Sequence, residues 1–250
     1  MKNHTPHLLL LALLLAAGAA LPAQNWNSWG KRKTVRGDGQ TTTDTRKLID
    51  FTRLDVCCGF DVELAQGDFA VEVEAERNLQ ELIRTEVRGS TLSIGWRENV
   101  NVKNTRPILV RVSLPALRGV AASSGCRVEG TTSMAAGGAE LELDASSGAR
   151  IELDYRGATA VEIEASSGSR VDLRGDGQRI YAEASSSGRV SAQDFRTEVA
   201  RARASSGANV SIHAERELHA DASSGGRISY SGNPAEIDSD ASSGGRVRGQ

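Results

Sequence analysis

The stretch Glu140-Leu-Glu-Leu-Asp-Ala-Ser-Ser-Gly-Ala-Arg-Ile-Glu-Leu-Asp154 decides the fold of this chain. Apolar residues occupy alternate positions on both sides of its Ser-Ser-Gly centre, and charged residues fill most of the positions between them. A period of two is typical of a β-strand that has one buried face and one exposed face. The stretch therefore predicts two strands that are joined by a corner of small residues.

Seven near-copies of the corner phrase Ala-Ser-Ser-Gly-X-Arg-Val follow one another in the second half of the chain. Their first residues are Ala122, Ala145, Ala165, Ala184, Ala204, Ala222 and Ala241. Successive copies begin 23, 20, 19, 20, 18 and 19 residues apart. A period near twenty is too short for a helical repeat and fits one coil of a β-solenoid. We predict an all-β fold, a right-handed β-helix with coils of about 20 residues.

Small residues are expected at the corners because stacked coils lie only about 4.8 Å apart. Glycine also adopts positive φ, and stacked serine hydroxyls can hydrogen-bond along the row. One copy places its glycine one position later, at Gly188, so the demand for glycine is not strict. We predict a structural row of corner glycines at Gly59, Gly125, Gly148, Gly168, Gly207, Gly225 and Gly244.

An eighth, disguised copy of the corner lies in the first half of the chain. Residues 54–64 align with residues 120–130, and Cys57 and Cys58 then stand where two corner serines are expected. The chain has 3 cysteines, and an odd number in an exported protein leaves a free thiol or an intermolecular bridge. Adjacent cysteines rarely bridge each other, so we expect all three to be small packing residues. The alternative is a bridge from Cys126 to one of the corner cysteines.

The first 23 residues have the features of a secretory signal. Lys2 provides a basic start, an apolar run covers residues 8–20, and Ala23 is a small residue suited to cleavage. The run is short for a membrane span, and no second apolar stretch of membrane length follows it. We therefore expect an exported protein without a membrane span in its mature chain, located in the periplasm or outside the cell.

The mature chain divides into two parts by composition. Residues 24–47 are polar and are predicted to form a flexible lead-in, whereas the solenoid is expected over residues 48–250. Its less regular N-terminal part covers residues 48–121, and the seven repeats occupy residues 122–250. Within the less regular part, Asn78 is a candidate cap for one or two helical turns. Strands are expected there at residues 69–75, 91–95 and 108–114.

The composition restricts the function. The chain carries a formal net charge of −2, whereas a nucleic-acid-binding domain needs a basic surface, so we expect no nucleic-acid partner. Aromatic residues make up only 4% of the sequence. Large rings fill wide interiors, and a narrow core of stacked aliphatic side chains needs few of them. The composition therefore agrees with a solenoid.

Two outward columns of charge follow from the repeats. Like charges one strand apart repel each other, so each column is unfavourable alone. The two columns either neutralise each other as a solvated surface or form a binding surface. The candidate binding column contains Arg127, Arg150, Arg170, Arg189, Arg227 and Arg246, with Asn209 in the same series. The other column contains Asp144, Glu164, Glu183, Arg203, Asp221 and Asp240.

Patterns for catalysis are sparse. The predicted mature chain has two histidines, His213 and His219, and their spacing fits no metal site. No glycine-rich phosphate loop precedes a helix, so we expect no catalytic residue, cofactor or metal. The tripeptides Arg36-Gly-Asp38 and Arg174-Gly-Asp176 match a cell-adhesion motif. A Gly-Asp turn beside a soluble charge is the simpler interpretation.

Three stretches carry a resemblance to a known family: residues 51–68 with the turn Gln66-Gly-Asp68, residues 71–76 and residues 91–94. Together with the Ser-Ser-Gly coils they make the chain similar to the putative auto-transporter adhesin, head GIN domain family, from about residue 48 to the C-terminus. The resemblance implies an exported bacterial β-helical protein with no known catalytic residue. The chain departs from the family in having two adjacent cysteines at its first corner.

Two functions from different classes follow. The first is a non-catalytic, exported, adhesion-like solenoid that presents a repetitive surface in the cell envelope, with a glycan or an envelope protein as its partner. The alternative is a polysaccharide-processing enzyme of the β-helix lyase kind, which would use the charged columns. Open ends of a solenoid are sheet edges that invite pairing. We therefore expect either a short cap from the lead-in or end-to-end self-association.

Overall fold

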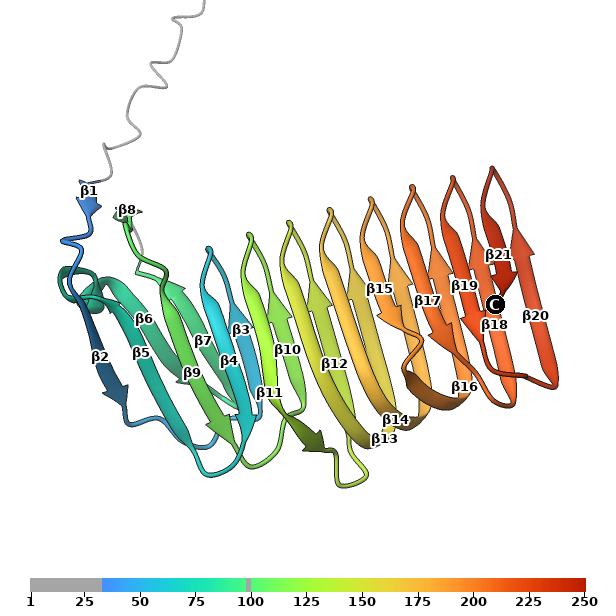
Figure 1. Ribbon diagram of the computed structural model, residues 1–250, viewed down its shortest axis with the longest axis horizontal. Helices are drawn as coiled ribbons and strands as arrows, with labels where there is room; N and C mark the ends of the chain where they lie inside the picture. The colour runs from blue at the N-terminus through green and yellow to red at the C-terminus, as the bar shows by residue number, and fades with distance from the viewer. Residues whose placement is uncertain (1–32, 98–99) are drawn as a thin grey trace, which may run out of the picture. The chain divides into compact units, whose positions relative to one another are not determined.

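Stacked parallel strands form the fold (Figure 1). The computed structural model describes residues 33–97 and 100–250, so the predicted signal over residues 1–23 lies outside the described residues. Each coil has a strand, a sharp corner, a second strand and a wider bend that leads to the next coil. Strands of successive coils pair in parallel and in register. The β-solenoid with coils of about twenty residues is therefore confirmed.

The strands form two layers. β13 (Arg150–Ala165) and β14 (Arg170–Ala184) continue round the wide bend without a break, so each contributes its C-terminal half to layer 1 and its N-terminal half to layer 2. Layer 1 otherwise contains β3 (Arg53–Val56), β10 (Gly119–Ala122), β12 (Glu140–Ala145), β16 (Phe195–Ala204), β18 (Glu217–Ala222) and β20 (Glu236–Ala241). Layer 2 otherwise contains β4 (Asp61–Gln66), β11 (Arg127–Ala135), β15 (Arg189–Ala192), β17 (Asn209–His213), β19 (Arg227–Ser231) and β21 (Arg246–Gly249).

Antiparallel strands cover the N-terminal end of this stack. β5 pairs antiparallel with β9, β2 pairs antiparallel with β5, and β6 pairs antiparallel with β7. β7 and β9 themselves pair in parallel with β3 and β4. The elements are β2 (Thr41–Arg46), β5 (Ala70–Glu76), β6 (Ile83–Arg88), β7 (Thr91–Trp96), β9 (Leu109–Leu114) and the 3₁₀ helix η1 (Arg77–Leu82).

Two of the sequence expectations differ from this end of the structure. We predicted residues 24–47 to be flexible, but this stretch contains two strands, β1 (Lys33–Arg36) and β2. β1 pairs with β8 (Val100–Lys103), and β2 pairs with β5. The short helix exists, but Asn78 is not its cap. The Asn78 amide instead donates to the Arg36 carbonyl at 2.8 Å, because the chain returns to this point from the lead-in.

Each corner is a tight turn with two consecutive residues of positive φ. Its second serine has φ between 48° and 55°, and the next residue has φ between 65° and 81°. Positive φ at both central residues is the requirement of a type I′ turn, and the Ala149 amide closes one such turn on the Ser146 carbonyl at 3.0 Å. The corner glycines at φ 73–81° are Gly59, Gly125, Gly148, Gly168, Gly207, Gly225 and Gly244.

Backbone groups connect one corner to the next. The Gly148 amide donates to the Ser167 carbonyl at 3.1 Å, and the Gly168 amide donates to the Ser186 carbonyl at 3.1 Å. From the sequence, serine hydroxyls can bond along this row, but among the described residues no corner hydroxyl bonds to another corner hydroxyl. The turn already aligns an amide with a carbonyl on each coil, so the hydroxyls are not needed for it.

The core is a pair of aliphatic columns between the layers. Along layer 1 these side chains are Leu141, Val161, Ile180, Ala200 and Leu218, all buried. Along layer 2 they are Val128, Ile151, Val171, Val190, Val210 and Ile228, all buried. Full burial of one large aliphatic side chain contributes about 1.5–3 kcal/mol, so the repeated column is the main source of stability.

The cysteines correct one expectation. Cys57 and Cys58 are bonded to each other as an adjacent-residue disulfide, a pairing that we had judged rare. Cys126 is a free, buried thiol, so it bridges neither corner cysteine. The alignment of the disguised copy is nevertheless right, because β3 and β4 lie in register beside β10 and β11 and bring the cysteine corner into the row.

Candidate functional site

The register of layer 2 aligns the residues that follow the corners into one outward column, here called the arginine column. It contains Arg127, Arg150, Arg170, Arg189, Asn209, Arg227 and Arg246. Its arginines are exposed except Arg170, which is half-buried. Neighbouring coils are about 4.8 Å apart, so the guanidinium groups repel one another unless anions lie among them.

A second outward column lies two residues further along each strand. In chain order it contains Glu129, Glu152, Asp172, Ser191, Ser211, Ser229 and Arg248. Its acids lie two residues from the first three arginines of the other column, and one of them, Asp172, forms an ion pair with its arginine, Arg170. Nε and Nη2 of Arg170 donate to the Asp172 carboxylate at 2.5 and 2.7 Å, and this hydrogen-bonded pair raises the pKa of Arg170.

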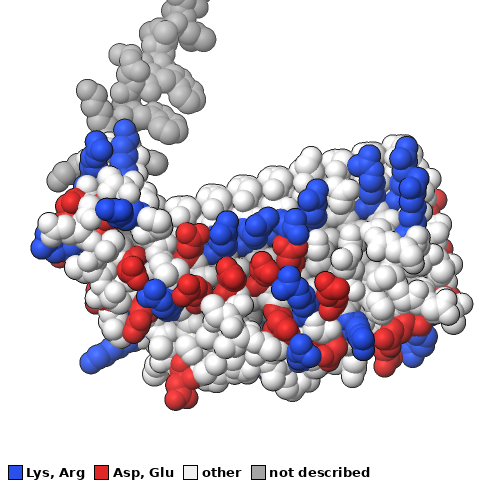
Figure 2. Space-filling view, in the orientation of Figure 1, with Lys and Arg blue, Asp and Glu red and all other residues white. Residues whose placement is uncertain are grey.

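The arginine column and the predicted acidic column do not neutralise each other. Asp144, Glu164, Glu183, Arg203, Asp221 and Asp240 form a column on layer 1. Because the two columns lie on different layers, the mutual neutralisation considered from the sequence does not occur. Figure 2 shows acidic and basic surface running side by side over layer 2, with basic surface alone towards β19 and β21.

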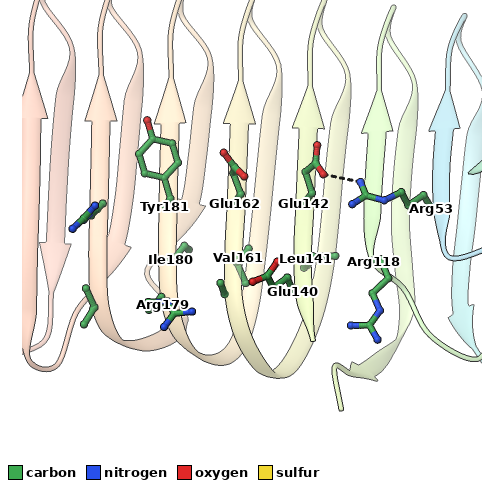
Figure 3. A pocket seen from close by; sticks show the side chains of 13 residues that line it. Arg53, Arg118, Glu140, Leu141, Glu142, Val161, Glu162, Arg179, Ile180 and Tyr181 are labelled. Carbon is green, nitrogen blue, oxygen red and sulfur yellow. Dashed lines mark hydrogen bonds and ion pairs between the residues drawn. The ribbon is translucent and has the colours of Figure 1, made fainter. Parts of the chain in front are cut away.

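Layer 1 carries a groove of about 520 Å³ (Figure 3). Its outward lining mixes both signs of charge, and Arg53 bonds Glu142 at 2.7 Å across two strands. Tyr181 is an aromatic side chain among these charges. The other polar lining residues are Arg118, Glu140, Glu162, Arg179 and Arg201.

Tyr181 is one candidate catalytic base in this groove. Its hydroxyl donates to Oε2 of Glu183 at 2.7 Å. Burial and this bond raise the pKa of Tyr181, although Arg203 lies 5.9 Å from the ring centre and acts in the other direction. A tyrosine that removes a proton needs a lowered pKa. The geometry therefore suits a binding side chain better than a base.

The acidic column is electrostatically unfavourable at its centre. Burial raises the pKa of Glu164, and the neighbouring carboxylates of Asp144 and Glu183 raise it further. Burial and the nearby carboxylate of Glu142 also raise the pKa of Asp144. Within residues 33–97 and 100–250, no group of three or more His, Cys, Asp or Glu side chains is placed to hold a metal ion.

The two histidines of the repeats point to different sides of the stack. His213 lies on β17 of layer 2, where its Nδ1 is 3.0 Å from the Ser231 hydroxyl. His219 lies on β18 of layer 1, between the carboxylates of Glu217 and Asp238. The structure does not bring them together, so they form no joint site.

Both Arg-Gly-Asp tripeptides are held by the fold. In the first, the Asp38 amide donates to Oδ1 of Asn78 at 3.0 Å. In the second, Asp176 lies within β14 and its Oδ1 accepts the Gly157 amide at 2.9 Å. Both aspartates thus take part in the local backbone arrangement.

Comparison with known proteins assigns the family. The family described as "Putative auto-transporter adhesin, head GIN domain" matches residues 50–234, which is most of the chain. The chain belongs to the head GIN domain family. No curated protein matches it in sequence.

Solved structures share the fold of this head GIN domain. A putative adhesin from Bacteroides fragilis is 15% identical with a TM-score of 0.78, over 86% of this chain and 100% of that one. A putative lipid binding protein from Parabacteroides distasonis is 18% identical with a TM-score of 0.70, over 87% and 100%. A putative adhesin from Parabacteroides merdae is 18% identical with a TM-score of 0.67, over 87% and 99%. At these identities the likeness concerns the fold.

Several surface residues of this head GIN domain were missed from the sequence. The groove residues Arg179, Tyr181 and Arg201 and the second column of layer 2 were not singled out. Their signal was the strand alternation itself, because each lies an even number of residues from a column that was identified. Among the described residues, no helix is long and apolar enough to cross a membrane.

Proposed function

We propose that this head GIN domain protein is a non-catalytic, exported, adhesion-like module that binds a glycan or an envelope protein through its repetitive outward surface. The periplasm or the cell surface is its place of action, as the predicted signal suggests. One observation supports the proposal most directly: a column of mostly exposed arginines follows layer 2 through seven coils.

The arginine column is suited to binding because most of its positive charge is not consumed by the fold. Among the described residues, Arg170 is the only arginine of the column that forms an ion pair with a carboxylate. A guanidinium group presents several donors in a fixed plane, which matches carboxylate, sulfate and phosphate. A column of such groups offers the same contact on successive coils, so affinity accumulates along an extended partner.

A polysaccharide lyase is the second candidate, because the groove on layer 1 combines Tyr181 with Arg179 and Arg201. Such an enzyme needs a base that removes a proton from the sugar ring. The raised pKa of Tyr181 and its bond to Glu183 argue against that role. We therefore favour binding over catalysis.

The test uses the purified protein on a sensor surface, with an envelope fraction and a panel of polysaccharides as analytes. We expect saturable binding that weakens by less than roughly threefold when Arg127 alone is changed to Gln, because the other arginines of the column also contribute to the affinity. Changing Arg127, Arg150 and Arg189 together should weaken it by roughly tenfold or more. Changing Arg88, Arg97 and Arg216 to Gln gives the same charge change outside both surfaces and serves as the control.

Catalysis is measured in the same samples. Lyase action releases unsaturated sugars that absorb ultraviolet light, and the proposal expects a flat absorbance trace with every polysaccharide. If such sugars were released, and the release stopped in the Tyr181→Phe variant, the lyase function would replace the proposed binding function. Absence of binding to both the envelope fraction and the panel would also end it.

A further inference from the structure

The charge of layer 2 changes along the stack. In the coils of β11, β13 and β14, each arginine of the column has a glutamate or aspartate two residues later. From β15 onward that position is Ser191, Ser211 and Ser229, and on β21 it is Arg248. The positive charge of Arg227 and Arg246 is therefore not balanced by the neighbouring column.

A hollow of about 210 Å³ lies on this part of layer 2. Its polar lining consists of Asn209, Ser211, Arg227, Ser229, Arg246 and Arg248, with the edges of Val210 and Ile228 beneath. None of these residues carries a carboxylate. Figure 2 shows the corresponding basic surface towards the end of the stack where Figure 1 places β19 and β21.

The three arginines of the hollow have no protein counter-charge within the described part of the chain. In that part of the chain, none of the residues Arg227, Arg246 and Arg248 takes part in an ion pair. Arg227 and Arg246 stand directly opposite each other on neighbouring strands, where like charges destabilise the pairing. An anion between them removes this repulsion and gains charge-assisted hydrogen bonds.

The hollow also offers neutral hydrogen-bonding groups. The hydroxyls of Ser211 and Ser229 lie 2.9 Å apart on neighbouring strands. Each hydroxyl both donates and accepts, which matches the hydroxyl groups of a sugar ring. Anionic groups beside hydroxyl groups are the chemistry of uronic acids and sulfated sugars.

We propose that Arg227, Arg246 and Arg248, with Ser211 and Ser229, bind the carboxylated or sulfated sugar residues of an acidic polysaccharide. This inference rests on the proposed function and names its ligand. The hollow is smaller than the pockets that enclose drug-sized ligands, so it holds one sugar residue of a longer chain. That chain runs across the strands, where the coil spacing of about 4.8 Å is close to the advance per residue of an extended glycan.

A nucleic acid fits this surface less well. Proteins that bind single strands stack the bases on aromatic side chains, and no aromatic side chain lines the hollow. A basic surface that offers hydroxyl groups and no aromatic side chain therefore favours an acidic glycan over a nucleic acid.

The experiment measures binding of the purified protein to dextran sulfate, polygalacturonate and uncharged dextran, with single-stranded DNA and free sulfate as further arms. We expect both acidic polymers to bind, uncharged dextran not to bind, and affinity to fall as salt is raised. Changing Arg227 and Arg246 together to Gln should weaken binding by roughly tenfold or more, and Ser211→Ala by roughly twofold to threefold. The control pair Arg88→Gln and Arg216→Gln removes the same charge elsewhere and should change binding by less than twofold.

Three outcomes would overturn the inference: an unchanged affinity of the Arg227 and Arg246 pair variant, an equal loss in the control pair, or DNA that binds more tightly than either acidic polymer. Thermal unfolding of each variant shows whether a loss of binding is a loss of fold. If uncharged dextran or the envelope fraction binds while the pair variant binds acidic polymers normally, the inference falls and the proposed function stands. If the protein binds none of the polymers and no envelope material, both fall.

Discussion

Ser187 has the backbone conformation that Gly168 has one coil earlier. Their φ angles are 65° and 73°. Each donates its amide hydrogen to a corner serine of the following coil, Ser187 to Ser206 at 3.2 Å and Gly168 to Ser186 at 3.1 Å. A residue with a Cβ pays about 1–2 kcal/mol in this left-handed region. The corner that lacks glycine at this position therefore keeps the shared turn at a conformational cost.

Replacing Ser187 by Gly should stabilise the protein. The substitution removes the cost of holding a Cβ-bearing residue in the left-handed region. It also gives the unfolded chain more conformational entropy, and this offsets part of the gain. We expect a net gain of about 0.5–1 kcal/mol in the free energy of unfolding. Urea denaturation followed by circular dichroism measures it as a higher midpoint.

The matched control is Gly168→Ala at the equivalent corner position. A Cβ there meets no atom within 4 Å, so the change tests backbone conformation without a clash. It should lower the free energy of unfolding by about 1 kcal/mol. If Ser187→Gly lowers stability, or Gly168→Ala leaves it unchanged, the corner conformation is not what sets these costs.

Glu76 joins the N-terminal strands by a buried carboxylate. It accepts hydrogen bonds from the Gly39 amide at 2.6 Å, the Thr105 hydroxyl at 2.6 Å and the Thr105 amide at 2.7 Å. Burial alone would raise its pKa, but these bonds outweigh burial and lower the pKa of Glu76 to about 2. The carboxylate thereby fastens Gly39, which directly follows the first Arg-Gly-Asp tripeptide, and Thr105 to the end of β5.

Changing Glu76 to Gln should destabilise the fold by about 2 kcal/mol at neutral pH, because it removes charge-assisted bonds and places an amide group against donors. Since the folded pKa is depressed, the stability from this carboxylate is full above the ordinary value of 4.5 and is lost as pH falls towards about 2. Urea unfolding of both proteins at several pH values should show the difference shrinking below 4.5. The exposed Glu81→Gln variant should match the parent; a constant difference for Glu76→Gln would contradict the assignment.

The coil, its corner and both outward columns could be predicted from sequence because a solenoid repeats one local rule. Strand alternation tells which side chains point outwards, and the fixed coil length tells which of them become neighbours. Leu141 and Val161 thus pair in the core, and Arg150 and Arg170 pair outside, as the spacing of the repeats indicates. The same rule also aligned the cysteine corner correctly.

The strand pairing at the N-terminal end and the basic hollow could not be predicted, because they depend on neighbours that no repeat specifies. β2 pairs antiparallel with β5, and alternation reveals which face of a strand is buried but not which strand lies beside it. The basic hollow arises because the second column, acidic up to Asp172, continues with three serines and then Arg248. Only the knowledge that this column neighbours the arginine column gives that change a meaning.

The cysteines allow a direct chemical test. With Cys57 bonded to Cys58 and Cys126 buried, the native protein should take up no alkylating reagent. Burial raises the pKa of the Cys126 thiol, which lowers its reactive thiolate fraction further. Intact mass should show one alkyl group after unfolding without reductant and three after unfolding with reductant.

Peptide mapping distinguishes this pattern from a bridge to Cys126. A disulfide between adjacent residues stays within one peptide, whereas a bridge from Cys126 would join two peptides. The Cys126→Ala variant should show no alkylation without reductant and two alkyl groups with it. Three alkyl groups in unfolded protein without reductant would mean that the two corner cysteines are not bonded.

His219 should remain protonated to a higher pH than an isolated histidine. Its Nε2 lies 2.7 Å from Glu217 and its Nδ1 lies 3.3 Å from Asp238, and the bond to Glu217 raises the pKa of His219 above 6.5 although Arg201 opposes it. A raised folded pKa stabilises the fold below the ordinary value, and the effect disappears as pH rises through the folded pKa. Nuclear magnetic resonance titration of the ring protons measures the shift.

Glu217→Gln should lower the pKa of His219. Asp221 is an ion-pair partner of Arg203, so Asp221→Asn should leave the pKa of His219 nearly unchanged. A titration at or below 6.5 in the parent protein would contradict the paired geometry.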